Sequence, residues 1–237
     1  MTEPSSPNPN NSKVKIITKV LTSAIKLWLR SQLNQVSHLE VQIEASDRQL
    51  LSGCIPGVLI SASNAVYQGL HITQIELQAE KIQLNVASIL KGQPLQLSAI
   101  VPVVGKLMIT EQDLNNSLSS PLLLTAINDV LILLLPEYSL NSKAINWRKI
   151  TLDNQVLILH GIPISDQDGA FFNIYLGLEL LNGQELQLTQ VQVKTDQEVL
   201  LEKNSPYIIN LGTDVDIEKI SLIPEQLFCS GRINVNP

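Results

Sequence analysis

The chain has 237 residues, of which 44% are hydrophobic and only 4% aromatic, and its formal net charge is −6. This length suits one large domain or two small ones and allows a sizeable core, which must be built mainly from Leu, Ile and Val. The acidic balance argues against nucleic-acid binding by the body of the protein. An aliphatic core suits either an ordinary β-rich interior or an acyl-chain ligand, and composition does not separate the two.

The amino-terminal end differs in charge from the rest of the chain. Residues 1–35 carry five basic residues against one acidic residue, a balance of +4, whereas the remainder carries 11 basic and 21 acidic residues, a balance of −10. This asymmetry predicts that one end of the protein approaches an anionic surface. Residues 1–12 are polar and rich in Pro and Asn, which predicts a disordered tail. They lack the features of a secretory signal, so we expect a cytoplasmic location.

Residues 13–33 have the pattern of an amphipathic helix. At about 100° per residue, the apolar face carries Trp28 and is widened by Ile16, Val20 and Leu27. A basic stripe lies opposite this face and comprises Lys15, Lys19, Lys26 and Arg30. This arrangement is typical of an interfacial helix, in which the basic stripe and Trp28 touch a membrane. The alternative is a helix docked on the core with solvated lysines, and the two interpretations are not exclusive.

The next part of the chain predicts antiparallel strands. From Val36 the apolar period changes to two, first in residues 38–45 and again in residues 55–63 and 70–86. The apolar parity slips at Glu80–Lys81, which predicts a β-bulge there. Short helical turns are expected at 46–53 and 87–92. Residues 93–109 are again extended, and Pro94 and Pro102 predict an edge strand or a kinked strand.

Two helices are predicted in the middle of the chain. Thr110 is the expected N-cap of a helix in "TEQDLNNSLSS", and Pro121 opens a second helix that Pro136 ends. This second helix holds eleven aliphatic residues between Leu122 and Leu135. It is too short to cross a bilayer, which needs about 20 apolar residues. We expect it to pack on the sheet and to line a groove with Leu123, Ile127, Leu131 and Leu134. Asn128 and Asp129 should then lie at the rim or in solvent.

The second half of the chain is almost entirely strand. Four alternating runs cover residues 145–152, 155–164, 170–181 and 184–194, with a hairpin turn at 182–184. One or two further strands are expected after residue 213. No composition break requires a second domain, so residues 13–237 are predicted to form a single domain. The sequence does not indicate an oligomeric state.

The sequence shows no pattern of catalytic or metal-binding residues. His38, His71 and His160 lie far apart in the chain and away from both cysteines, which argues against a zinc site. Asp214 and Asp216 are interpreted as solvated rather than as calcium ligands, because a full calcium loop is missing. Neither a nucleotide-binding nor a hydrolase motif occurs. We therefore expect no catalytic residues, no metal and no cofactor. Cys54 and Cys229 are expected to be free thiols.

One region resembles a known family. The stretch from "LLSGCIPGVLISASNAVYQGL" to "LMITEQDLNNSLSSPLL" is similar in its order of motifs to the LmeA-like phospholipid-binding family. The shared motifs are an L-x-G turn, the Gly69–Leu70 turn, a second L-x-G turn at Leu90–Gly92 and the T-E-x-D-L-N start of a helix at Thr110. The resemblance implies a TULIP-like α+β fold, in which a long curved antiparallel sheet wraps around one or more helices, and it implies phospholipid binding. It brings no catalytic residues.

The pattern and the resemblance together predict a non-enzymatic lipid-binding protein. It would hold a phospholipid or similar lipid in an elongated apolar groove and associate peripherally with a membrane, with lipid transfer as a further possibility. The alternative function is a non-catalytic scaffold that presents the amino-terminal helix to a protein partner. A lipid hydrolase that uses Asp214, Asp216 and His160 is the least supported hypothesis.

Overall fold

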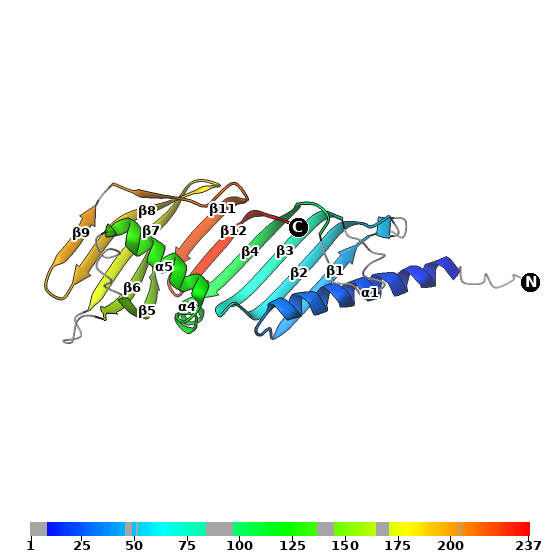
Figure 1. Cartoon of the computed structure of the whole chain (residues 1–237), viewed down its shortest axis with the longest axis horizontal. Coiled ribbons are helices and arrows are strands. Elements are labelled where there is room, and N and C mark those ends of the chain that lie inside the picture. The colour runs from blue at the N-terminus through cyan, green and yellow to red at the C-terminus, as the bar shows by residue number, and fades with distance from the viewer. Residues whose placement is uncertain are drawn as a thin grey trace, which may run out of the picture.

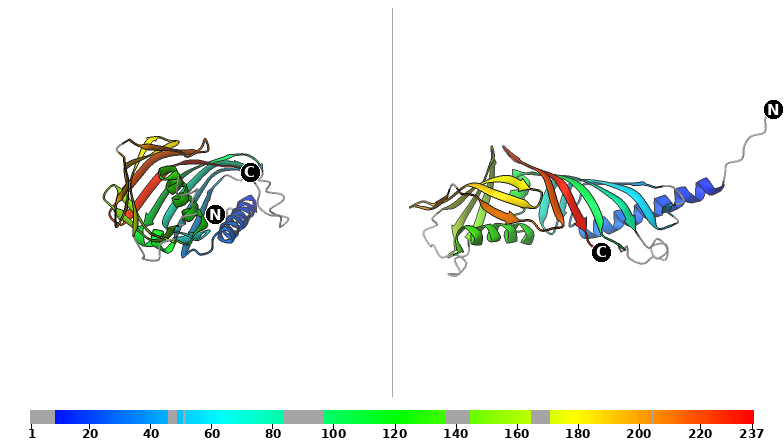
Figure 2. Two further views of the ribbon diagram at one scale, coloured as in Figure 1. Left: turned by 60° about the vertical axis from the view of Figure 1, so that its left-hand side comes forward. Right: turned by 90° about the horizontal axis from the view of Figure 1, so that it is seen from above.

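Antiparallel strands form most of the protein, and the helices lie on one side of them. The structure is a computed structural model that describes residues 9–45, 49–50, 52–83, 97–136, 145–164, 171–203 and 205–237. The strands form two sheets that follow one another along an elongated molecule (Figure 1). Figure 2 shows that the sheets are curled and that the helices lie on the same side of them.

The first sheet combines strands from both ends of the chain. Its order is β1-β2-β3-β4-β12-β11, and every neighbouring pair is antiparallel. The carboxyl-terminal hairpin β11–β12 therefore completes a sheet that the first half of the chain begins. The strands are β1 (His38–Glu44), β2 (Cys54–Tyr67), β3 (Leu70–Gln83), β4 (Val101–Thr110), β11 (Val215–Ile223) and β12 (Gln226–Val235).

The second sheet is built from consecutive strands in the order β10-β8-β7-β6-β5, with β9 also paired to β8. The four predicted runs of the second half correspond to β5–β8, and the predicted hairpin turn between β7 and β8 is confirmed at residues 183–184. The strands are β5 (Ile145–Asp153), β6 (Val156–Pro163), β7 (Phe172–Asn182), β8 (Glu185–Thr195), β9 (Val199–Lys203) and β10 (Tyr207–Asn210).

Three described helices lie over these sheets: α1 (Pro9–Gln32), α4 (Glu111–Asn116) and α5 (Pro121–Leu134). α1 begins at Pro9 rather than at Lys13, so it reaches into the segment predicted as a tail. α5 confirms the predicted aliphatic helix, with Pro121 in its first turn. No described helix combines the length and hydropathy that a transmembrane helix needs. The predicted turn at 46–53 lies partly outside the described residues, and the turn at 87–92 and Pro94 lie wholly outside them.

Two details of the first sheet differ from the predictions. The slip at Glu80–Lys81 is not a β-bulge, because the β2–β3 register is the same on both sides of it. Lys81 instead adopts a φ of 53°, so both strands change the face that they bury without losing their pairing. Of the two alternatives that Pro102 predicted, the edge strand is wrong, because β4 lies between β3 and β12, and the kinked strand stays a prediction. Pairing with β3 ends at Val103, so Pro102 lacks an N–H where no partner needs one.

The T-E-x-D-L-N stretch fastens α4 to the first sheet. Thr110 is the N-cap, and its hydroxyl accepts a hydrogen bond from the Asp113 N–H at 3.2 Å. The Asp113 carboxylate accepts hydrogen bonds from the hydroxyls of Thr110 and of Thr73 on β3. The buried Ser117 hydroxyl accepts the His71 N–H at 2.8 Å and donates to the Asp113 carbonyl. The motif therefore holds α4 against the start of β3.

The same short helix also holds the edge of the second sheet. The Asn115 side chain donates to the Ile150 carbonyl at 2.8 Å and accepts the Ile150 N–H at 2.9 Å. The Glu111 carboxylate accepts the Leu152 N–H at 2.8 Å. These side chains supply β5 with the hydrogen bonds that a further strand would otherwise make. The motif shared with the resembling family is thus one joint between the two sheets, beside backbone hydrogen bonds such as that from the Glu225 N–H to the Leu152 carbonyl at 3.0 Å.

Candidate functional site

An apolar cavity of about 210 Å³ lies between α1 and the first sheet. Helix α1 forms one wall, and β2, β3, β4 and β12 form the other. Every described residue that lines the cavity is aliphatic except for one tryptophan, Trp28. The lining comprises Ile25, Trp28, Leu29, Val58, Ile60, Leu77, Ala79, Ile82, Leu97, Val101, Val103, Ile233 and Val235.

The strand register explains why these side chains meet. Val58 on β2 pairs with Ala79 on β3, Ala79 pairs with Val103 on β4, and Val103 pairs with Ile233 on β12. Directly paired residues of antiparallel strands point to the same face of the sheet, so this row crosses the inner face beneath α1. Ala79 lies in the middle of the row and has the smallest side chain in it. The short side chain leaves depth that the helix above does not fill.

Helix α1 turns its apolar face to the sheet. Leu21 and Ile25 are buried, whereas Lys19 and Arg30 are exposed and Lys26 is half-buried. Lys15 belongs to α1, but its side chain lies outside the described residues. Trp28 is 39% exposed and lines the cavity, on the side of the helix away from the basic residues. The structure therefore separates Trp28 from the cations with which it was grouped, and membrane contact by this set of residues stays a prediction.

Two apolar residues of α1 remain in solvent. Leu27 is 69% exposed and Val20 is 41% exposed, and both lie on the flank between the buried face and the basic stripe. The exposure of these two residues could be predicted from the sequence, because both widen the apolar face of the helix beyond what docking on a sheet requires. The strand residues that line the cavity were harder to predict. Alternation identifies the inner face of each strand, but it does not show which strands are neighbours.

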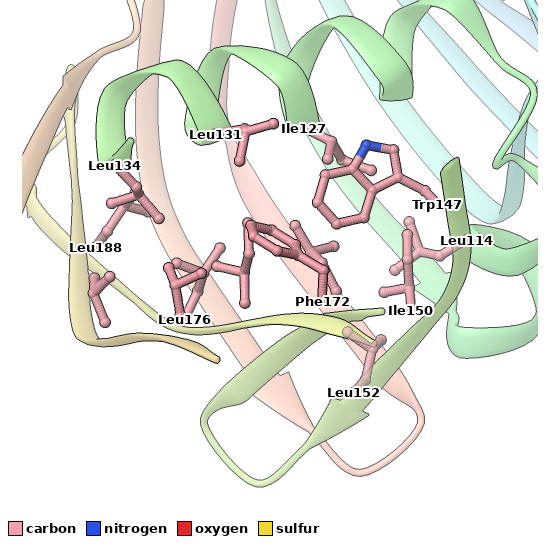
Figure 3. Packing of buried hydrophobic residues seen from close by; sticks show 14 of the residues in the cluster. Leu114, Ile127, Leu131, Leu134, Trp147, Ile150, Leu152, Phe172, Leu176 and Leu188 are labelled. Atoms are coloured by element: carbon pink, nitrogen blue, oxygen red, sulfur yellow. The ribbon is translucent and has the colours of Figure 1, made fainter. Parts of the chain in front are cut away.

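The four residues predicted to line a groove lie elsewhere. Ile127, Leu131 and Leu134 are buried in a second hydrophobic cluster between α5 and the second sheet, and Leu123 packs against it (Figure 3). None of the four lines the cavity under α1. A role for them in lining a groove stays a prediction. Asn128 and Asp129 are exposed, as expected for the outer face of α5.

The histidines and aspartates considered as catalytic or metal-binding candidates do not come together in one site. The His160 ring nitrogens contact Thr151 Oγ1 at 3.1 Å and Asn173 Oδ1 at 2.8 Å, across β5, β6 and β7. Asp214 instead interacts with Asn236 near the carboxyl terminus. His38 is exposed and His71 is half-buried. Within the described part of the chain, no three His, Cys, Asp or Glu side chains are placed to share a metal ion.

Both cysteines are free thiols, as predicted. Cys54 begins β2, and Cys229 lies in β12 opposite Leu107 of β4. Burial of Cys229 raises the pKa of its thiol above the ordinary value, because the thiolate loses hydration there. A raised pKa disfavours the reactive thiolate form, so this cysteine is not an activated nucleophile.

Comparison with known proteins identifies one family. No curated protein and no solved structure matches the chain. The sequence model of the LmeA-like phospholipid-binding family matches residues 14–232, which include most of α1, strands β1–β11, most of β12 and all of the cavity residues except Ile233 and Val235. Because the match covers nearly the whole length, the chain belongs to the LmeA-like phospholipid-binding family.

Proposed function

We propose that the protein shelters the hydrocarbon part of a phospholipid, or of a similar lipid, in the cavity between α1 and the first sheet. The observation that carries this proposal is a cavity lined by apolar described residues in a member of a phospholipid-binding family. A curled antiparallel sheet with helices on its inner side is also the arrangement that the resemblance to TULIP-like proteins implies. Catalysis has no part in this proposal.

The size of the cavity limits how much of a lipid tail the protein can bury, and therefore how much binding free energy the tail contributes. Each buried CH₂ contributes about 0.8 kcal/mol, so a fully sheltered sixteen-carbon chain gains about 12 kcal/mol gross. The cavity volume of about 210 Å³ lies below the range of roughly 300–1,000 Å³ for pockets that enclose a drug-sized ligand. The cavity therefore shelters part of a lipid in the described conformation. Transfer of a whole lipid through water would require α1 to move away from the sheet.

We further propose that α1 brings the protein to an anionic membrane. Lys19, Lys26 and Arg30 lie away from the buried face, and the exposed Val20 and Leu27 lie beside them. The amino-terminal end of α1 also extends past β1, beyond the edge of the sheet (Figures 1 and 2). Each basic residue near an anionic leaflet contributes about 1 kcal/mol, and salt weakens the attraction. The resulting association is peripheral and reversible, and it suits the anionic cytoplasmic face of a membrane.

Liposome flotation tests the membrane step. The Lys19→Glu/Lys26→Glu variant should bind vesicles containing phosphatidylglycerol at least tenfold more weakly than the unaltered chain, because two attractive charges become repulsive. Lys106→Glu/Lys149→Glu is the matched control, since it makes the same change in charge at exposed positions of β4 and β5. Equal binding of the two variants, or binding of the unaltered chain that ignores lipid charge, would favour the scaffold function instead.

Mass spectrometry tests the cavity. The protein purified from a bacterial host should carry lipid and should extract labelled phospholipid from vesicles. Ala79→Leu adds three carbon atoms to the centre of the cavity lining and should reduce the bound lipid several-fold. Ala126→Leu makes the same change at an exposed position of α5 and should leave it unchanged. Finding no lipid on the unaltered chain and no extraction would contradict the proposal.

A further inference from the structure

We propose that the cavity under α1 is a single-tail site, which takes one hydrocarbon chain and leaves the headgroup, the glycerol and any second chain outside. The protein would then select lipids by the length of one tail and not by their headgroup. This inference rests on the proposed lipid-binding function and specifies the ligand class of the same site.

The lining excludes the headgroup from the interior. Among the described lining residues, only the Trp28 indole carries a side-chain hydrogen-bonding group, and no charged side chain is present. A polar group that leaves water without gaining a hydrogen bond loses a large free energy of solvation, and a phosphate loses more. Only methylene and methyl groups can therefore enter.

The volume limits the site to one chain. The cavity of about 210 Å³ is smaller than the pockets of roughly 300–1,000 Å³ that enclose a drug-sized ligand. This space takes part of one extended tail, and two phospholipid tails side by side do not fit. The second tail and the remainder of the first must stay in the membrane or in contact with the outer surface.

Within the described part of the chain, the mouth of the cavity also lacks groups that would recognise a headgroup. Trp28 on α1 and Ile233 on β12 both line the cavity and are 39% and 42% exposed, so the cavity meets solvent at these residues. Arg30 lies two residues beyond Trp28 in the helix and therefore points to the opposite side. Arg232 precedes Ile233 in the strand and points to the opposite face of the sheet. The charges nearest in sequence to the mouth are thus directed away from it.

Trp28 provides an internal reporter of tail binding. The chain has two tryptophans, and the other one, Trp147, is buried in the second hydrophobic cluster. The Trp147 indole N–H has no hydrogen-bond partner among the described residues, so Trp147→Phe removes an unpaired buried group together with the competing signal. In this variant, a tail with bromine atoms near its end should quench Trp28 fluorescence when it enters the cavity.

The experiment compares single-chain lipids in 0.5 M salt, which suppresses the attraction between α1 and anionic headgroups. The probes are lysophosphatidylcholine, lysophosphatidylglycerol and the free fatty acid, each with the same brominated tail and each below its micelle concentration. The three dissociation constants should agree within about threefold. Lengthening the tail should tighten binding about fourfold per methylene until the cavity is full, after which the affinity should level off.

The outcomes separate this inference from the proposed function. A headgroup preference above about tenfold, or continued tightening for tails far longer than the cavity, would overturn the single-tail site and leave lipid binding intact. Failure of every probe to bind would overturn the proposed function itself. Calorimetric titration of the unaltered chain with the same lipids gives the comparison without any substitution. In Ala79→Leu, the affinity should level off at a shorter tail than in the Ala126→Leu control.

Discussion

The two ends of the molecule use the same arrangement for different purposes. At one end α1 covers the first sheet, and at the other α5 covers the second sheet, each helix with its apolar face inward. Beneath α5, Trp147 and Phe172 meet edge to face with ring centroids 6.2 Å apart, and leucines surround them (Figure 3). Beneath α1, the buried cluster has no ring and includes the short side chain of Ala79. Two rings pack into one interface, and short aliphatic side chains line a cavity in the other.

The hollow interface is costly for a protein that keeps it empty. Apolar surface that α1 and the sheet leave unburied forgoes about 25 cal/mol of stabilisation for each Å². An apolar ligand under α1 would recover part of the lost contacts. The contrast therefore supports the binding role that we propose for the first interface.

The largest expected effect comes from opening the filled interface. Phe172→Ala removes a fully buried ring from the α5 cluster and should lower the free energy of unfolding by about 3–5 kcal/mol. Denaturant titration followed by circular dichroism measures this change. Lipid binding by the molecules that remain folded should be unaffected, because Phe172 does not line the cavity under α1. A loss below about 1 kcal/mol would mean that the second interface is also loosely packed.

The next effect concerns the joint between the two regions. Asn115→Ala leaves the N–H and carbonyl of Ile150 without their side-chain partner and should cost about 2 kcal/mol. Asn116→Ala is the control, because the neighbouring Asn116 is exposed, and it should change stability by less than about 0.5 kcal/mol.

The same variant tests whether the two regions unfold together. Trp28 reports on the first region and Trp147 on the second, so single-tryptophan versions can be followed separately. The unfolding transitions of the two regions should coincide when Asn115 is present and should move apart in Asn115→Ala. Coincident transitions in the variant would show that α4 is not what couples the sheets.

A smaller expected effect is the difference in stability when a larger side chain is introduced into each of the two interfaces. Val193→Leu inserts a methylene into the cluster under α5 and should cost about 1–3 kcal/mol, because this residue is fully buried. Val103→Leu makes the same change in the cavity lining and should cost less than about 1 kcal/mol. Thermal unfolding of the two variants gives the comparison. Equal losses would indicate that the cavity is closed by side-chain motion in solution.

The smallest expected effect lies on β12, which runs between the two regions. Its Leu227 packs against the α5 cluster, its Ile233 lines the cavity, and Cys229 lies between them. Because burial raises the pKa of Cys229, its thiolate fraction at pH 8 should be lower than that of a free thiol. Alkylation should therefore be slow at pH 8 and should still increase above pH 9, as followed by mass spectrometry. A rate at pH 7 equal to that of a small thiol would contradict this environment.

Much of the local structure was predictable because it depends on neighbouring residues. The period of two predicted β5–β8, and Thr110 and Pro121 marked the starts of α4 and α5. The error in strand placement came from long-range pairing. Pro102 pointed to an edge strand or a kinked strand, and β4 became a central strand when β12, more than a hundred residues later, paired with it. The cavity was missed for the same reason, since Ile233 joins Val103 only through this pairing.

The sequence by itself determined which residues are apolar on each face of each element, and it carried the family resemblance that residues 14–232 confirm. Tertiary structure decided which apolar faces pack against each other and how closely their side chains fit. It placed Ile127, Leu131 and Leu134 in a hydrophobic cluster that contains two rings, and it set Trp28 over a row of short side chains. The physical reason is that a cavity is a property of the volume between elements. Chain pattern fixes the direction of each side chain, but the space left over depends on which elements pack together and on how well their shapes match.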